Sequence, residues 1–102
     1  MKAWKVCERR VAELLGGKRV PVSGQTRGDH PDVEHTTLSI ECKSRKTLPA
    51  WIEDAMKQAE ASAKDGQLPV VVLHQDHRPY TESLVVLRLQ GFAGHLKQGR
   101  GG

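Results

Sequence analysis

The stretch 31-PDVEHTTLSIECKSRK-46 decides the fold, because it contains two short strand-like runs joined by a polar turn. The second run is the clearer one: Leu38, Ile40 and Cys42 alternate with Ser39, Glu41 and Lys43. This period of two is typical of a strand with one buried face, and it places Glu41 and Lys43 on the same, opposite face. Asp32 to His35 forms a shorter run, which we predict to be the preceding strand.

A helix is predicted before this stretch. Apolar residues recur at helical spacing over 4–15, and Gly16-Gly17 provides a C-terminal stop. The predicted inward stripe comprises Trp4, Cys7, Val11, Leu14 and Leu15. Glu8 shares this stripe, so a carboxylate is expected on the buried side, where it needs a partner or a function. Residues 18–23 then indicate a strand, with Pro21 favouring an edge or a bulge.

After the stretch, Pro49 opens a second helix that ends at Asp65-Gly66. Its apolar stripe is Ile52, Ala55, Met56, Ala59 and Ala63. Residues 70–73 and 84–89 read as strands, joined by a polar connection. This order predicts an α/β protein with a mixed β-sheet of about five strands flanked by two helices. We expect a single domain over residues 1–92 and a flexible, basic, Gly-rich tail over 93–102.

Composition limits the classes of partner and location. Sixteen Lys and Arg against twelve Asp and Glu give a net charge of +4, which suits a polyanion such as nucleic acid but is also common in small proteins. Cys7 and Cys42 lie in a predicted helix and strand, which favours reduced thiols over a disulfide framework. The sequence contains no membrane-span pattern or signal-peptide apolar run, so we expect a cytoplasmic protein without membrane association.

Asp32, Glu41 and Lys43 offer the groups that phosphodiester hydrolysis needs. Pairing of the two strands would bring the two carboxylates within reach of one Mg²⁺, which neutralises phosphate charge and activates water. A lysine beside them can orient or deprotonate the attacking water. The alternative is that the three residues are ordinary surface charges.

Pro31-Asp32 followed by Glu41-Cys42-Lys43 resembles the signature of the PD-(D/E)xK nuclease superfamily, which has a restriction-endonuclease-like core. Within the superfamily the chain is most similar to archaeal-type Holliday junction resolvases. That similarity comes from Glu8 in the first helix, Val22-Ser23-Gly24 after the first strand, and the run 40-IECKSRK-46. It spans roughly residues 5 to 90.

The resemblance implies a divalent metal, Mg²⁺ with Mn²⁺ as a substitute, and the following ligands: Asp32, Glu41, the backbone carbonyl of Cys42, and Glu8. It further implies that Lys43 acts on the water and that Ser23 lies near the scissile phosphate. Four basic or polar residues flank these positions and are predicted to contact DNA phosphates. They are Arg27, Ser44, Arg45 and Lys46.

The sequence therefore predicts a metal-dependent endonuclease that leaves 5′-phosphates, acts on branched DNA as a homodimer and resolves Holliday junctions; a phage origin would suit its small size. Alternatives within enzymes are a DNA nickase, a replication- or packaging-associated nuclease of the same fold, or an RNA nuclease. A DNA-binding module whose nuclease site has decayed is the alternative from another class. Zinc bound by His30, His35, His74 and His77 is a weaker alternative, because structural zinc ligands usually come in closely spaced pairs.

Overall fold

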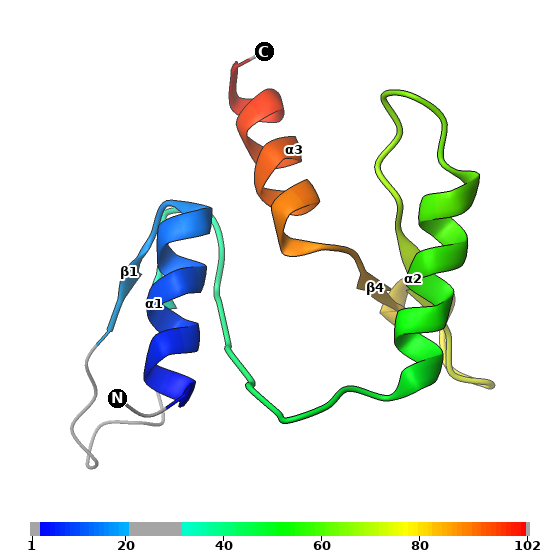
Figure 1. Ribbon diagram of the computed structural model, residues 1–102, viewed down its shortest axis with the longest axis horizontal. Helices are drawn as coiled ribbons and strands as arrows, with labels where there is room; N and C mark the ends of the chain where they lie inside the picture. The colour runs from blue at the N-terminus through cyan, green and yellow to red at the C-terminus, as the bar shows by residue number, and fades with distance from the viewer. Residues whose placement is uncertain (1–2, 21–31, 102) are drawn as a thin grey trace. The chain divides into compact units, whose positions relative to one another are not determined.

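A computed structural model of the chain describes residues 3–20 and 32–101. The chain divides into two compact units, Met1–Lys46 and Thr47–Gly102 (Figure 1). The described residues form three α-helices, one short 3-10 helix and two antiparallel sheets of two strands each. The predicted mixed α/β class is confirmed at this level. No sheet of five strands is observed within residues 3–20 and 32–101, and the prediction of a single domain stays a prediction.

Helix α1, Ala3–Leu15, confirms the first predicted helix. It ends at Gly16, whose φ of +78° is a left-handed conformation that glycine adopts without strain. Glu8 lies on the buried face, as predicted, together with Ala12 and Leu15. The predicted stripe is wrong at Trp4 and Leu14, which are both exposed, so the inward face is rotated toward Glu8 and Ala12.

Strands β1, Lys18–Arg19, and β2, Val33–Glu34, pair antiparallel, with Arg19 opposite Val33. Helix α1 packs against both strands (Figure 1). Val33 is fully buried beneath the helix, which makes it the centre of this unit's core. The β-branched side chain suits this position because it packs well on a pleated surface.

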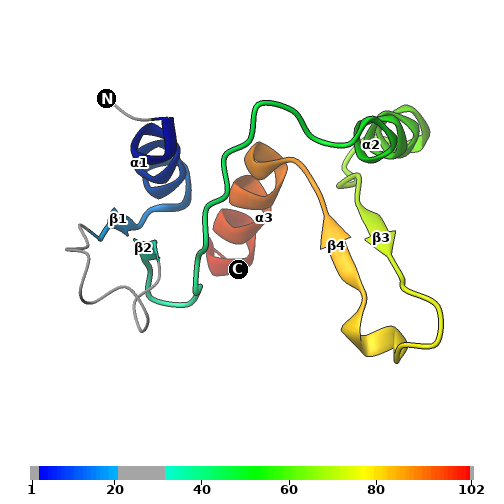
Figure 2. The ribbon, with the colours of Figure 1, turned by 90° about the horizontal axis from the view of Figure 1, so that it is seen from below.

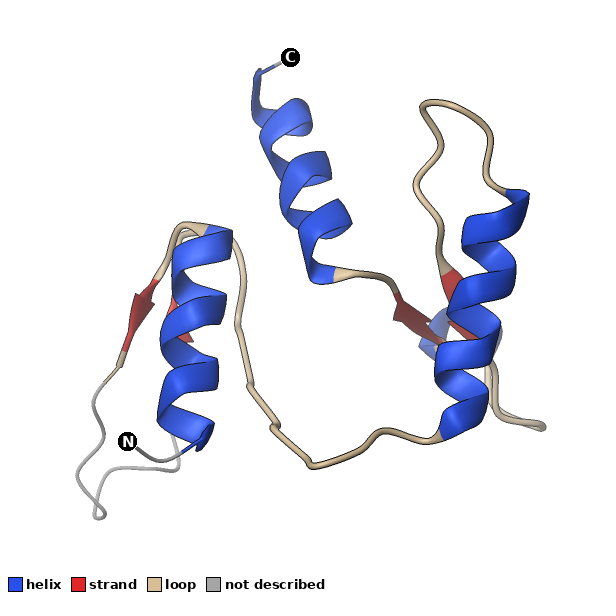
Figure 3. Cartoon of the chain, in the orientation of Figure 1, coloured by secondary structure: helices blue, strands red, loops and turns tan. Residues whose placement is uncertain are grey.

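In the part of the chain that the structure describes, the segment 38–43 forms one bridge, Val33 with Ile40, and is otherwise drawn as loop (Figure 3). The predicted full strand is therefore reduced to one paired residue. The alternation itself is confirmed: Ile40 is buried, Leu38 and Cys42 are half-buried, and the three residues between and after them are exposed.

His35 organises the turn that leads into this segment. Its Nδ1 accepts the N–H groups of Thr37 and Leu38, at 3.1 and 3.2 Å. Because Nδ1 accepts, Nε2 carries the proton in the neutral ring and donates to the Leu15 carbonyl at 2.9 Å. One imidazole thus ties the turn to the end of α1.

In the second unit, helix α2, Ala50–Ser62, begins directly after Pro49 as predicted. Met56 is buried, and the other four residues of the predicted apolar stripe are half-buried. Strands β3, Val71–Leu73, and β4, Leu84–Val86, form an antiparallel hairpin whose connection contains the 3-10 helix η2, Tyr80–Glu82. Figure 2 shows the hairpin, with α2 preceding it along the chain. Helix α2 contacts β3.

Helix α3, Leu89–Gly101, occupies most of the region predicted as a tail over 93–102. Its apolar residues follow helical spacing at Leu89, Phe92, Ala93 and Leu96, and Ala93 is buried. Glycines disfavour a helix by about 1 kcal/mol each, which is why the composition suggested a tail. A close contact accounts for one of them, because a Cβ at Gly91 would lie 2.7 Å from Leu68 Cδ1.

Arg88 joins the end of β4 to α2. Its guanidinium pairs with Glu53 at 2.5 Å and with Glu60 at 3.0 Å. The two glutamates lie two turns apart on the helix, so one side chain spans both. The hydrogen bond from Arg88 lowers the pKa of Glu53. The hydrogen bonds to Glu53 and Glu60 together raise the pKa of Arg88.

Replacing Gly17 with alanine should destabilise the first unit. The added Cβ would lie 2.4 Å from the Glu34 carbonyl oxygen and 2.8 Å from Val33 Cγ1, and a backbone atom cannot move aside cheaply. We expect a loss of about 1 to 3 kcal/mol in the free energy of unfolding, measured by urea denaturation. Gly94→Ala is the matched control, since nothing lies within 4 Å of its Cβ, and it should not destabilise the protein. Equal effects of the two changes would contradict this packing.

The Arg88 pairing should make stability depend on acid pH. Because the pKa of Glu53 is lowered in the folded chain, its contribution is complete above the ordinary value of 4.5 and is lost as the pH falls below it through the folded pKa. Arg88→Gln should therefore cost stability at pH 6 and much less at pH 3, as measured by urea denaturation. A cost that is the same at both pH values would show that the ion pair contributes nothing.

Candidate active site

Asp32 is held by hydrogen bonds from both neighbouring segments. Its carbonyl accepts the N–H of Val20 at 3.2 Å, and its N–H donates to the carbonyl of Ile40 at 2.9 Å. Its carboxylate Oδ2 accepts the N–H of Cys42 at 2.6 Å, a short charge-assisted bond. Backbone and side chain of Asp32 are therefore both fixed against residues 40–42.

Glu41 lies between the two residues that Asp32 contacts. Its side chain is exposed, and so is that of Lys43, whereas Ile40 and Cys42 turn toward the core. The structure thus places the predicted Asp32 beside the segment that contains the predicted Glu41. Lys43 follows on the same exposed side of the segment, as its spacing predicted.

Glu8 has a partner that the sequence did not predict. Arg19 Nε donates to Glu8 Oε1 at 2.8 Å, and the two side chains are 27% and 10% exposed. The Trp4 ring covers the same guanidinium, 5.7 Å from the ring centroid. The position of Arg19 could have indicated this pairing. Arg19 is an inward residue of the next strand, opposite Val33, and a buried carboxylate requires a cation.

The Cys42 thiol lies where α1 and Asp32 meet. Burial is the main reason that its pKa rises from 9.0 to about 11, and the neighbouring Cys7, Asp32 and Glu8 raise it further. Both cysteines are free, in agreement with the prediction of reduced thiols. The carboxylates of Glu8 and Asp32 therefore act on one common atom.

The side chains available to a metal are few. In residues 3–20 and 32–101, no three His, Cys, Asp or Glu side chains are grouped as metal ligands. Mg²⁺ commonly uses only one or two protein carboxylates and keeps several waters, so Asp32 and Glu41 match its usual donor set. The Cys42 carbonyl is a further oxygen of the right kind. Glu8 would have to share its carboxylate with Arg19.

The remaining predicted site residues fall into two groups. Ser23, Arg27 and His30 lie outside the described residues. Ser44, Arg45 and Lys46 are all exposed, immediately after Lys43, and Arg45 Nη1 donates to the Ser44 carbonyl at 3.0 Å. This segment is thus accessible to a polyanion. A ring nitrogen of His35 and one of His74 each form a hydrogen bond with a backbone carbonyl, which is a structural role for a histidine.

No protein-family model, curated protein or solved structure matches this chain. Among the described residues, no helix is long and apolar enough to cross a membrane.

The raised pKa of Cys42 predicts an unreactive thiol. At pH 8 the folded, metal-free chain should hold about 100-fold less Cys42 thiolate than the unfolded chain, and alkylation by iodoacetamide should slow at least in proportion. The protonated Cys42 thiol also contributes to the free energy of unfolding, and this contribution should be lost as the pH rises from 9.0 through about 11. Peptide mapping by mass spectrometry measures the rate at this residue. Equal rates in buffer and in urea would contradict the burial of the thiol.

Proposed function

We propose that this chain is a Mg²⁺-dependent endonuclease of the PD-(D/E)xK type that cuts branched DNA, a Holliday junction resolvase. The observation that carries the proposal is the 2.6 Å hydrogen bond from the Cys42 N–H to Asp32 Oδ2. It fixes one carboxylate beside the residue that supplies the other, with a lysine two positions further.

The donor set suits the proposed metal. Asp32, Glu41 and the Cys42 carbonyl are hard oxygen ligands, which Mg²⁺ prefers and which Mn²⁺ also accepts. Asp32 uses Oδ2 for the Cys42 N–H, and no hydrogen bond from another described residue occupies Oδ1, which would be the atom that faces a cation. When bound, the metal would neutralise phosphate charge and lower the pKa of a water molecule.

The chain's own residues perform the remaining tasks. Lys43 would orient the attacking water and take part in removing its proton. The water oxygen attacks phosphorus, the bond to the 3′ oxygen breaks, and that oxygen leaves as a hydroxyl, so the product carries a 5′-phosphate. Glu8 would support the site through Arg19 and the packing around Cys42.

The wider assembly is part of the same proposal. Exposed Ser44, Arg45 and Lys46 would contact phosphates that flank the cut. Two symmetric nicks require two active sites, so we propose a homodimer. We also propose a restriction-endonuclease-like sheet of about five strands, in which α2 serves as the crossover helix, and action on DNA in the cytoplasm, as for a phage recombination enzyme.

The test is cleavage of a labelled four-way junction beside linear duplex, single-stranded and flap DNA of the same sequences. With Mg²⁺ the junction should receive paired nicks, and a chelator should abolish them. Glu41→Gln and Lys43→Ala should each lower the cleavage rate at least about 100-fold, because each removes a group needed in the transition state. Junction affinity, measured by fluorescence anisotropy, should change little.

Glu34→Gln is the matched control, since Glu34 is an exposed glutamate on the neighbouring strand with no role in the proposed site. It should cut at the wild-type rate. Tight binding without cleavage under any metal would replace the proposal with a DNA-binding module. Equal cleavage of linear duplex would replace it with a general nickase.

A further inference from the structure

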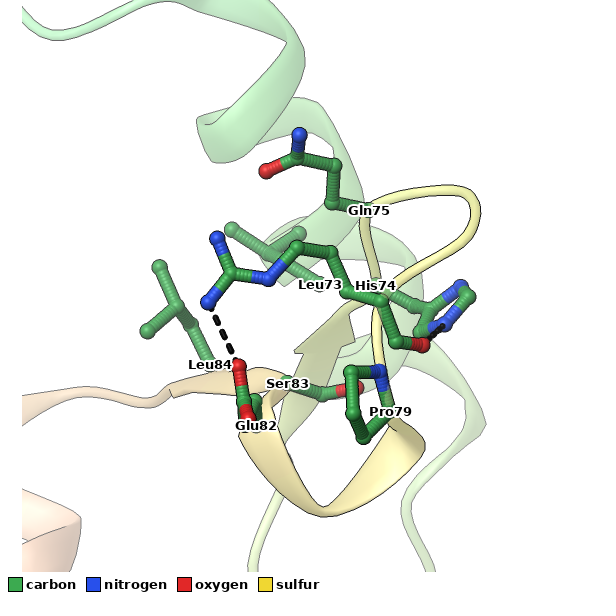
Figure 4. A pocket seen from close by; sticks show the side chains of 8 residues that line it. Leu73, His74, Gln75, Pro79, Glu82, Ser83 and Leu84 are labelled. Carbon is green, nitrogen blue, oxygen red and sulfur yellow. Dashed lines mark hydrogen bonds and ion pairs between the residues drawn. The ribbon is translucent and has the colours of Figure 1, made fainter.

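The connection between β3 and β4 lines a partly open cavity of about 270 Å³ (Figure 4). Its principal lining residues come from the end of β3, the connection and the start of β4: Leu73, Gln75, Arg78, Glu82, Ser83 and Leu84. One water molecule in the liquid occupies about 30 Å³, so a single buried water does not fill this space. Drug-sized ligands use pockets of about 300 Å³ and more, so the cavity suits a smaller molecule.

One of the lining residues carries a buried polar atom that has no partner among the described residues. Within the described residues, the Ser83 hydroxyl oxygen is buried and makes no hydrogen bond. Leaving a buried hydroxyl unpaired is unfavourable, so a ligand that bonds to it recovers free energy that the folded chain has lost.

The lining combines apolar walls with a neutral polar edge. Leu73 and Leu84 lie opposite each other across the hairpin and supply apolar surface. Arg78 and Glu82 form an ion pair at 2.5 Å, which presents donors and acceptors side by side with no net charge. The Glu82 carboxylate disfavours a phosphate or another anion here. A flat, uncharged molecule with donors and acceptors on its edge is the best match.

Tyr80 indicates which class of flat molecule this is. Its ring stacks on His74, with centroids 4.0 Å apart and planes at 11°, and His74 is itself fixed by a bond to the Arg78 carbonyl at 3.0 Å. Yet Tyr80 remains 79% exposed. An oriented, exposed aromatic ring beside the cavity suits a second base of the same strand, because every base can stack on an aromatic ring.

We infer that the cavity at the tip of the β3–β4 hairpin binds an unpaired nucleobase of DNA. Enzymes that extrude a base read its edge through hydrogen bonds and hold its faces against apolar or aromatic side chains. Bases at a branch point cost least to unstack, so this site would favour branched DNA over linear duplex. The inference rests on the proposed function for its substrate, but the cavity belongs to the Thr47–Gly102 unit, whereas the proposed catalytic residues belong to the other.

The experiment is an NMR titration of the full ¹⁵N-labelled chain with deoxyadenosine, followed through backbone amide shifts, with deoxyribose and inorganic phosphate as controls. Only the nucleoside should give saturable shifts, centred on residues 73–84. A duplex with one bulged adenine should shift the same amides, and a fully paired duplex should not. If the nucleoside binds but the bulged duplex does not, the site takes free nucleosides and the inference is overturned.

Ser83→Ala should weaken nucleoside binding about fivefold, the effect of one hydrogen bond, while the melting temperature stays the same or rises. Ser62→Ala, at an exposed serine of α2, is the matched control and should change neither quantity. Unchanged affinity in Ser83→Ala would mean that the hydroxyl serves water only, which would overturn the inference. Junction cleavage without nucleoside binding would refute this site alone, and nucleoside binding without cleavage would refute the nuclease alone.

Discussion

The hydrogen bond between the Asp32 carboxylate and the Cys42 N–H links residues 38–43 to the start of β2, in addition to the bridge that Ile40 forms. Residues 38–43 contribute one bridge to β2, through Ile40, so the Cys42 amide requires an acceptor from elsewhere. The short aspartate side chain supplies it without leaving its own strand. The same contact fixes the Asp32 carboxylate beside residues 40–42, the segment that contains Glu41.

Beneath α1, the core of the first unit combines apolar packing with one buried ion pair. Val33 and Ile40 fill the space beneath α1, while Glu8 faces Arg19 beside them. A buried carboxylate without a cation would be costly, so removing either partner should cost more than removing a surface pair. Arg19 therefore makes it possible for the helix to carry an acid at this depth, next to the Cys42 thiol.

The features that were predictable from the sequence depend on local periodicity. The extent of α1, the inward position of Glu8 and the alternation over 38–43 all follow from residue spacing. The features that were missed depend on contacts between distant segments. Arg19 becomes the partner of Glu8 only through strand pairing. Helix α3 was not predicted because its glycines suggested a tail, although Gly91 permits close packing on Leu68.

In the second unit, two different sets of contacts hold the base and the tip of one hairpin. At its base, Arg88 links the chain after β4 to two glutamates of α2, a connection between residues 28 and 35 positions apart. At its tip, the contacts within the connection are local: Arg78 with Glu82, the Arg78 N–H with the Gln75 carbonyl, and Tyr80 with His74. Substitutions within residues 74–83 can therefore change the shape and the edge of the cavity while the base of the hairpin stays in place. A loop with that independence is well suited to selecting a substrate.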